Sequence, residues 1–544
     1  MARGKVSLAD RQRRPIACHT CRRRKQKCLG GPPCEACTKR NTECTFEPND
    51  QTSSDSSSFS GHPPKRRHIE EVTGLRSHLD LLADLGSQGQ DEYMRGRMID
   101  SDQSINSEQD EEFKLPQQQR MLPDSTREFL SVGDAVTLPY LQAIRVNVEA
   151  VAGQSKFTLD AQRHPIIAPC VSTPDQISTP MLEKKVVDLL MKYYFTSAHG
   201  IMNILDQGAF KKLLNSWYSS PYAVDPSGLC LIYLVLAIGL VMAAPEPDSP
   251  EASIIVDIQS QHEGQAECFF RNANDLARTV SGFEDGDFWS IQALSLMSVY
   301  TLTISKWTPA YKYLGEAVRS AYALGLHKGP DLATCKNEHL AEERNLWRSL
   351  FVLDRFLATA LGLPVAISEE VCSKDSLEAL PSTKKSGKKR RRSQSVSSSG
   401  LDACVQASEF VSQALKRVYS GAQISTQVAH EIADACKRWA QRIPQKLDWF
   451  HLFNRNSTPA HGMAILHTQL FGCHSIMLFT RPFFLHLFSR VQPNVAGSQD
   501  ETQQPNPRLD LLSEACVAAS MQTIKLVQQV YQARRLPQRS PFVM

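Results

Sequence analysis

The sequence lacks the marks of an enzyme, a secreted protein or a membrane protein. It contains no phosphate-binding Walker loop, no dinucleotide-binding fingerprint and no nucleophile elbow. No apolar stretch follows the initiating methionine, so we expect no secretory signal and a reducing compartment. The longest apolar run, residues 228–244, ends at Pro245 and is at the short edge for a membrane span, which indicates a buried helix. We therefore expect neither catalysis nor membrane association.

Positive and negative charges nearly balance over the whole chain, which leaves a net charge of only +4. Composition alone thus does not indicate a nucleic-acid partner, but the distribution of the charge does. Between Arg11 and Cys44, ten Lys and Arg residues stand against two acidic residues, a local excess of +8. A basic block of that density predicts a polyanion as partner.

The rest of the chain alternates between polar segments and helical patterns. From residue 181 onward, apolar residues recur at spacings of three and four, as in LEKKVVDLLMKYYF and EERNLWRSLFVLDRFLATALG, which predicts amphipathic helices. We find no convincing alternating pattern of a strand and no internal repeat. The fold class we expect is a small cysteine-rich cluster module, a short coiled coil, disordered linkers and a large all-α domain.

The expected boundaries follow the changes in composition. They are a disordered tail (1–10), a cysteine-rich module (11–46), a flexible linker (47–68), a short coiled coil (69–86), an acidic disordered segment (87–125), a transition region (126–180), an all-α domain (181–380), a basic, Ser-rich disordered insert (381–400) and the continuation of the helical domain (401–544).

Six of the fifteen cysteines fall within the basic block, and the other nine are scattered singly. The six repeat one half-motif, C-x2-C-x6-C, which gives each half three thiolates, whereas structural zinc takes four ligands. If two zinc ions share two bridging sulfurs, each ion has four ligands although each half supplies only three thiolates. A single four-cysteine site with two spare cysteines, or disulfides, are the alternatives, and the repeated half-motif disfavours both. The predicted ligands are Cys18, Cys21, Cys28, Cys34, Cys37 and Cys44.

This spacing resembles that of the fungal zinc binuclear cluster (Zn2Cys6) transcription factors, without a gap from residue 18 to residue 44. A basic run after the second cysteine and a proline before the fourth extend the likeness. The resemblance implies that two Zn²⁺ ions are bridged by Cys18 and Cys34. It also implies a nuclear, sequence-specific transcription factor of the RNA polymerase II type that binds double-stranded DNA and regulates a pathway-specific set of genes.

Charge and size agree with a DNA-binding role for the module. Six thiolates and two Zn²⁺ carry a combined charge of −2, which leaves an excess of about +6. Such a module is too small to bury much apolar surface, so metal binding should supply most of its folding free energy. The basic side chains are then free to serve a partner.

The basic side chains between Cys21 and Cys28 should lie on a short helix, where they suit phosphate and guanine contacts. In the family, the third and fourth positions after the second cysteine approach a CGG triplet, and here these are Arg24 and Lys25. Ordinary solvated charges are the alternative reading. The predicted DNA contacts are Arg22, Arg23, Arg24, Lys25 and Lys27, with Lys39 and Arg40 in the equivalent place of the second half.

A possible dimerisation element follows the linker. Val72, Leu75, Leu79 and Leu82 have the spacing of a coiled-coil seam, although only two heptads fit and Gly74 lies inside them. In the family, a linker and a short coiled coil follow the cluster in this order, so a homodimer is predicted. An isolated amphipathic turn is the alternative.

The helical part also resembles the regulatory region of the family, through YLGEAVRSAYALGLHKGP, EERNLWRSLFVLDRFLATALGLPVAI, WAQRIPQKL and IMLFTRPFFLHLF. The resemblance implies a domain that passes a signal to the transcription machinery. Within it, Asp354 and Arg355 are expected to form a buried or half-buried polar contact. Histidines such as His467 and His474, which share a helix face, are interpreted as core residues rather than metal ligands. Basic clusters at 22–27, 65–67 and 388–392 support nuclear localisation.

Overall fold

The chain divides into two compact units, residues 1–70 and residues 71–544. The computed structural model describes part of each, and the linker, the predicted coiled coil and the tail lie outside the described residues. The described residues are 20–21, 34–40, 112–114, 121–123, 129–131, 137–159, 182–198, 200–221, 224–261, 264–279, 286–329, 340–378, 396–419, 423–452, 457–490 and 507–542.

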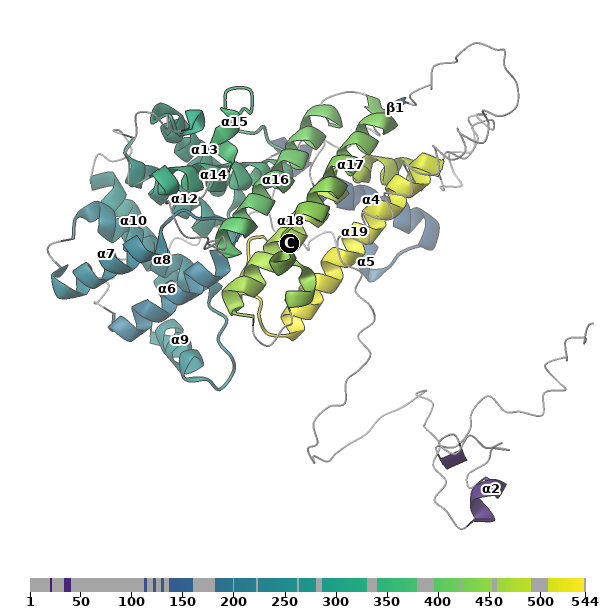
Figure 1. Ribbon diagram of the computed structural model, residues 1–544, viewed down its shortest axis with the longest axis horizontal. Coiled ribbons are helices and arrows are strands. Elements are labelled where there is room, and N and C mark those ends of the chain that lie inside the picture. The colour runs from purple at the N-terminus through teal and green to yellow at the C-terminus, as the bar shows by residue number, and fades with distance from the viewer. Residues whose placement is uncertain are drawn as a thin grey trace, which may run out of the picture. The chain divides into compact units, whose positions relative to one another are not determined.

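The described part of the second unit is predominantly helical (Figure 1). Its α-helices are α4 (Thr137–Ala152), α5 (Lys156–Leu159), α6 (Lys184–Ala198), α7 (Gln207–Ser219), α8 (Pro226–Met242), α9 (Pro250–Gln261), α10 (Gln265–Thr279), α12 (Phe288–Thr303), α13 (Trp307–Ala323), α14 (Leu340–Leu361), α15 (Lys374–Leu377), α16 (Val396–Arg417), α17 (Thr426–Arg442), α18 (Pro459–Arg490) and α19 (Pro507–Gln532). Short 3-10 helices are η3 (Leu326–Lys328), η4 (Gln445–Leu447) and η5 (Trp449–His451).

Helices α8 and α12 form the centre of the first half of this unit. Both are apolar all round rather than amphipathic, which is typical of helices that other helices cover on every side. Helix α8 packs against α6, α10 and α12. Several hydroxyl groups buried in α12 donate to its own backbone: Ser295 donates to the carbonyl of Ile291 at 2.6 Å, and Thr301 donates to that of Met297 at 2.8 Å. The apolar run at 228–244 is thus a buried helix, as the sequence indicates.

Helix α18 has the corresponding place in the second half, between α16, α17 and α19. Among the described residues it is the one helix long and apolar enough to cross a membrane, over Pro459–Phe488. However, 89% of its apolar window is buried inside the fold, and the core helix of a protein in water meets the same criteria.

Two features of the structure differ from what the sequence predicts. Strands β1 (Glu112–Lys114) and β4 (Gln423–Ser425) pair antiparallel, and so do β2 (Met121–Pro123) and β3 (Phe129–Ser131), where no strand was expected. Each has three residues, too few to produce a readable alternation. In addition, residues 396–400, assigned to the insert from composition, form the first turn of α16, where Ser399 and Gly400 are buried.

A glycine allows the close approach of α8 to α6. A Cβ atom at Gly239 would lie 2.2 Å from the carbonyl oxygen of Leu190, which belongs to the α6 backbone. Backbone cannot move aside as a flexible side chain can, so Gly239→Ala must push the two helices apart.

We therefore expect Gly239→Ala to lower the free energy of unfolding by about 1–3 kcal/mol. Urea unfolding followed by circular dichroism measures it. Gly315→Ala on α13 is the control, because a Cβ there meets no atom within 4 Å and alanine favours the helix by roughly 1 kcal/mol. Equal stability of the two variants would contradict the packing described.

Candidate metal centre

The first unit contains a tight helical turn that carries two of the predicted ligands. Cys34 immediately precedes α2 (Glu35–Thr38), and Cys37 lies within it. The carbonyl of Cys34 accepts hydrogen bonds from the N–H groups of Cys37 and Thr38, at 2.9 and 3.0 Å, and from the Thr38 hydroxyl at 3.1 Å. This turn places the two thiols of a C-x2-C pair on the same side of the backbone, as the spacing predicts.

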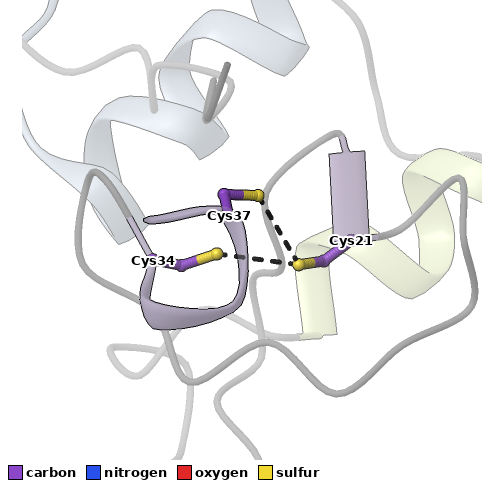
Figure 2. Close-up of side chains that lie close together, drawn as sticks. All are labelled: Cys21, Cys34 and Cys37. Carbon is purple, nitrogen blue, oxygen red and sulfur yellow. Dashed lines mark hydrogen bonds between the residues drawn. The ribbon is translucent and has the colours of Figure 1, made fainter. Parts of the chain in front are cut away.

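A third thiol, from the first half-motif, joins this pair (Figure 2). The Sγ atom of Cys21 lies 3.6 Å from that of Cys34 and 3.9 Å from that of Cys37. All three sulfur atoms fall within 4.8 Å of one another. Cys21 is 13 residues from Cys34 in sequence, so folding of the chain has brought the two half-motifs together.

The arrangement suits a zinc–thiolate centre. Zinc binds cysteine sulfur at about 2.3 Å with tetrahedral angles, so two sulfurs on one ion lie about 3.8 Å apart. The observed separations bracket that value. The three side chains are at most 3% exposed, which shields a bound ion from water. Among the described residues they are the one group of three or more His, Cys, Asp or Glu side chains placed to hold a metal ion.

The remaining predicted site residues are placed only in part. Lys39 and Arg40, which follow Cys37, are exposed at the surface of the module. The N–H of Arg40 donates to the carbonyl of Cys37 at 3.2 Å and extends the turn. The other predicted ligands and basic residues lie outside the described residues: Cys18, Cys28, Cys44, Arg22, Arg23, Arg24, Lys25 and Lys27.

Burial, sulfur spacing and the paired half-motifs define a zinc-binding cysteine cluster, and comparison with known proteins places it in a family. Residues 16–53 match the model of the fungal Zn(2)-Cys(6) binuclear cluster domain, and residues 191–456 match that of the fungal specific transcription factor domain. The chain belongs to the fungal Zn(2)-Cys(6) transcription factor family. The cluster domain of this family binds two zinc ions.

Relatives that match most of the chain are named as regulators. An uncharacterized transcriptional regulatory protein of Schizosaccharomyces pombe is 21% identical over 96% of this chain and 70% of its own length. The thiamine repressible genes regulatory protein thi1 of the same yeast is 22% identical over 68% of this chain and 52% of its own. Filamentous growth regulator 27 of Candida albicans is 21% identical over 75% and 50%. The chain thus spans about half the length of the last two relatives.

In the helical unit, Asp354 and Arg355 form the buried polar contact that the sequence predicts. Both side chains are 1% exposed, and the guanidinium of Arg355 donates to a carboxylate oxygen of Asp354. The same carboxylate accepts the N–H groups of Ala366 and Ile367 at 2.9 and 3.1 Å. Arg355 also donates to the Ile367 carbonyl at 3.0 Å and to Ser412 on α16. The pair therefore ties α14 to the loop that follows it and to α16.

Two further arginines on α14 were not anticipated. Arg344 donates to the backbone carbonyl of Asp375, and Arg348 donates to the Leu377 carbonyl at 3.0 Å and to the carboxylate of Asp402. The contacts of Arg348 therefore join residues on either side of the basic insert. The sequence does contain a signal for them: positions 344, 348 and 355 are spaced by four and seven, which places three arginines on one face of the helix.

His474 behaves as a core histidine, as the sequence analysis interprets it. Its Nε2 atom lies 3.1 Å from the hydroxyl of Thr359 on α14. Burial, together with the positive charge of Arg481, lowers the pKa of His474 to about 3. The ring is therefore neutral at physiological pH, and it contacts a hydroxyl group of the neighbouring helix α14.

Proposed function

We propose that this chain is a zinc-dependent, sequence-specific DNA-binding transcription factor that acts in the nucleus on genes read by RNA polymerase II. The observation that carries the proposal is the buried cluster of Cys21, Cys34 and Cys37, with sulfur spacing suited to zinc, inside a basic segment. Membership of a family of transcriptional regulators supports it. None of the three relatives described above is named as an enzyme.

In this proposal all six cysteines hold the two zinc ions, with Cys18 and Cys34 as bridging ligands. Bound zinc supplies the folding free energy that so small a module cannot obtain from apolar burial. Cys21 and Cys34 come from different half-motifs and lie 3.6 Å apart, which agrees with a centre shared between the halves. The cysteines of the two halves would fix the backbone on either side of the basic run.

That basic run is the proposed DNA-reading element. We place Arg24 and Lys25 at the edges of guanines in CGG-like triplets, where Arg and Lys can donate to the O6 and N7 acceptors. Arg22 and Lys27 contact phosphates, and Arg23 adds positive charge to the same basic run. Lys39 and Arg40 contribute phosphate contacts from the second half, consistent with their exposure next to Cys37. Affinity should fall steeply with salt because neutralised phosphates release counterions.

Lys25→Ala should weaken binding to a CGG-containing duplex by about 5- to 150-fold, the equivalent of roughly 1–3 kcal/mol, and should relax the preference at one base pair. The reason is that the substitution removes a donor to guanine, and this donor does not contribute to binding of a scrambled duplex. Fluorescence anisotropy with CGG and scrambled duplexes measures both affinities.

Arg22→Ala is the matched control on the same run. Loss of a phosphate contact should weaken binding to both duplexes alike and reduce the slope of affinity against salt by about 1. If Lys25→Ala lowered affinity for the CGG and scrambled duplexes equally, the assignment of Lys25 to base reading would be wrong.

We further propose that Val72, Leu75, Leu79 and Leu82 pair two copies through a short coiled coil. The helical domain would then pass a signal to the transcription machinery, and Arg348 and Arg355 would keep its helix α14 joined to α16. The basic clusters at 22–27, 65–67 and 388–392 serve nuclear entry in this proposal.

A further inference from the structure

Helix α19 has an outward face with an unusual pattern. The helix packs on α18, and Leu512, Ala519 and Leu526 on its inner face are each at most 1% exposed. In Figure 1 the yellow α19 lies along one side of the unit. Exposed residues on the opposite face recur at alternating spacings of four and three over about three heptads: Asp510, Glu514, Val517, Met521, Ile524, Gln528 and Tyr531. Lys525 is also exposed, next to Ile524 at the edge of this row.

This spacing is that of a coiled-coil seam, on the side of the helix that faces away from its own core. Its middle is apolar: Val517, Met521 and Ile524 are 47%, 49% and 59% exposed, and Tyr531 is 71% exposed. The solvent face of a surface helix is ordinarily polar, whereas scattered apolar residues show no period. A run that keeps the 3.5-residue repeat is therefore suited to a partner helix.

Charge at the two ends of the seam indicates which partner helix fits. Among the side chains described at its N-terminal end, the exposed ones are acidic, Asp510 and Glu514, and just beyond its C-terminal end Arg534 is exposed. Two copies of this seam are complementary when antiparallel, because each acidic end then meets the other's basic end. Antiparallel packing also sets the helix dipoles in opposition, which is favourable.

We propose that the outward face of α19 is a self-complementary interface that joins a second copy of this chain in antiparallel orientation. A two-fold axis between Met521 and Ile524 places Met521 of one copy opposite Ile524 of the other. The same axis sets Glu514 near Tyr531 and Arg534 of the partner. The contact is separate from the proposed pairing at residues 72–82 and does not depend on DNA binding.

The test uses the full chain, loaded with zinc, in the absence of DNA. Leu75→Lys with Leu79→Lys forms the background, because it removes the proposed coiled coil and leaves α19 as the source of dimers. Sedimentation equilibrium should then still detect a dimer. Adding Ile524→Asp should raise its dissociation constant by about 30-fold or more, as expected for a central interface residue. Circular dichroism verifies that the fold is kept.

Val256→Asp on α9 is the matched control, since Val256 is also 59% exposed but has no place in the seam. It should leave the dissociation constant unchanged. The proposal is overturned if the background chain is monomeric at every concentration, or if Val256→Asp weakens the dimer as much as Ile524→Asp. It is also overturned if Ile524→Asp lowers the melting temperature without changing the mass, since a segment of the same chain would then cover the seam.

Charge exchange tests the orientation. Asp510→Lys with Glu514→Lys should weaken the dimer, because the basic end of the partner then meets positive charge. Adding Arg534→Glu should restore most of the lost affinity in the antiparallel arrangement. In a parallel pair, like ends would meet, and adding Arg534→Glu would not restore the affinity of the dimer. That result would refute the proposed geometry.

Discussion

Cys34→Ala is expected to abolish zinc-dependent folding of the first unit and, with it, specific DNA binding. Cys34 is fully buried, its sulfur lies 3.6 Å from that of Cys21, and it precedes the turn that carries Cys37. As a proposed bridging ligand it contributes to both zinc ions, so its loss leaves each ion one thiolate short of a tetrahedron. No apolar core replaces the missing metal–ligand bonds.

Affinity for a CGG duplex should then fall to the level of non-specific binding, a loss of about 1,000-fold or more. Metal analysis of the purified full chain and fluorescence anisotropy measure the two effects together. The control is Cys268→Ala, which removes a half-buried thiol of the helical unit. That variant should keep two zinc ions and full affinity. A Cys34→Ala chain that retained both ions and bound its duplex normally would contradict the role of Cys34.

Arg355→Ala is expected to destabilise the helical unit by about 3–5 kcal/mol. The carboxylate of Asp354, 1% exposed, would lose its charged partner and remain buried. Ser412 and the carbonyl of Ile367 would lose the same donor, so the hydrogen bond from Arg355 on α14 to α16 would be lost together with the ion pair. Removing one member of a buried pair costs far more than the pair itself contributes, because the other charge stays out of water.

Arg417→Ala is the control for this prediction. Arg417 donates to Glu431 at 2.6 Å, but the two side chains are 41% and 50% exposed, so water screens the pair. Its removal should cost about 0–1 kcal/mol. Urea unfolding of both variants, with the transition of the helical unit followed by circular dichroism, compares them directly. A loss below about 1 kcal/mol for Arg355→Ala would show that Asp354 finds another partner.

Features with a local spacing rule were predictable from the sequence. The C-x2-C spacing requires a tight turn, and the turn at Cys34 and Cys37 has that geometry. The apolar run at 228–244 has no polar face, so it had to be covered by other helices, as α8 is. Asp354 and Arg355 could be placed in a polar contact because they stand in an apolar helical stretch, where charges must find partners.

Features that depend on distant parts of the chain were not predictable. Ser412 lies 57 residues from Arg355, and Asp402 lies 54 residues from Arg348, so no pattern in α14 specifies which residue accepts each guanidinium. The strands β1 and β4 are each three residues long and are joined by pairing across more than 300 residues. The early start of α16 follows from burial of Ser399 and Gly400, which the Ser-rich composition conceals.

The most direct test is to count zinc by native mass spectrometry on the full chain and, on the same preparation, to titrate CGG and scrambled duplexes at several salt concentrations. We predict two zinc ions per chain, tighter binding to the CGG duplex, and affinities that fall as salt rises. Removal of the metal by a chelator should abolish the preference. A chain that held no zinc, or that held two ions and bound neither duplex at low salt, would contradict the proposal.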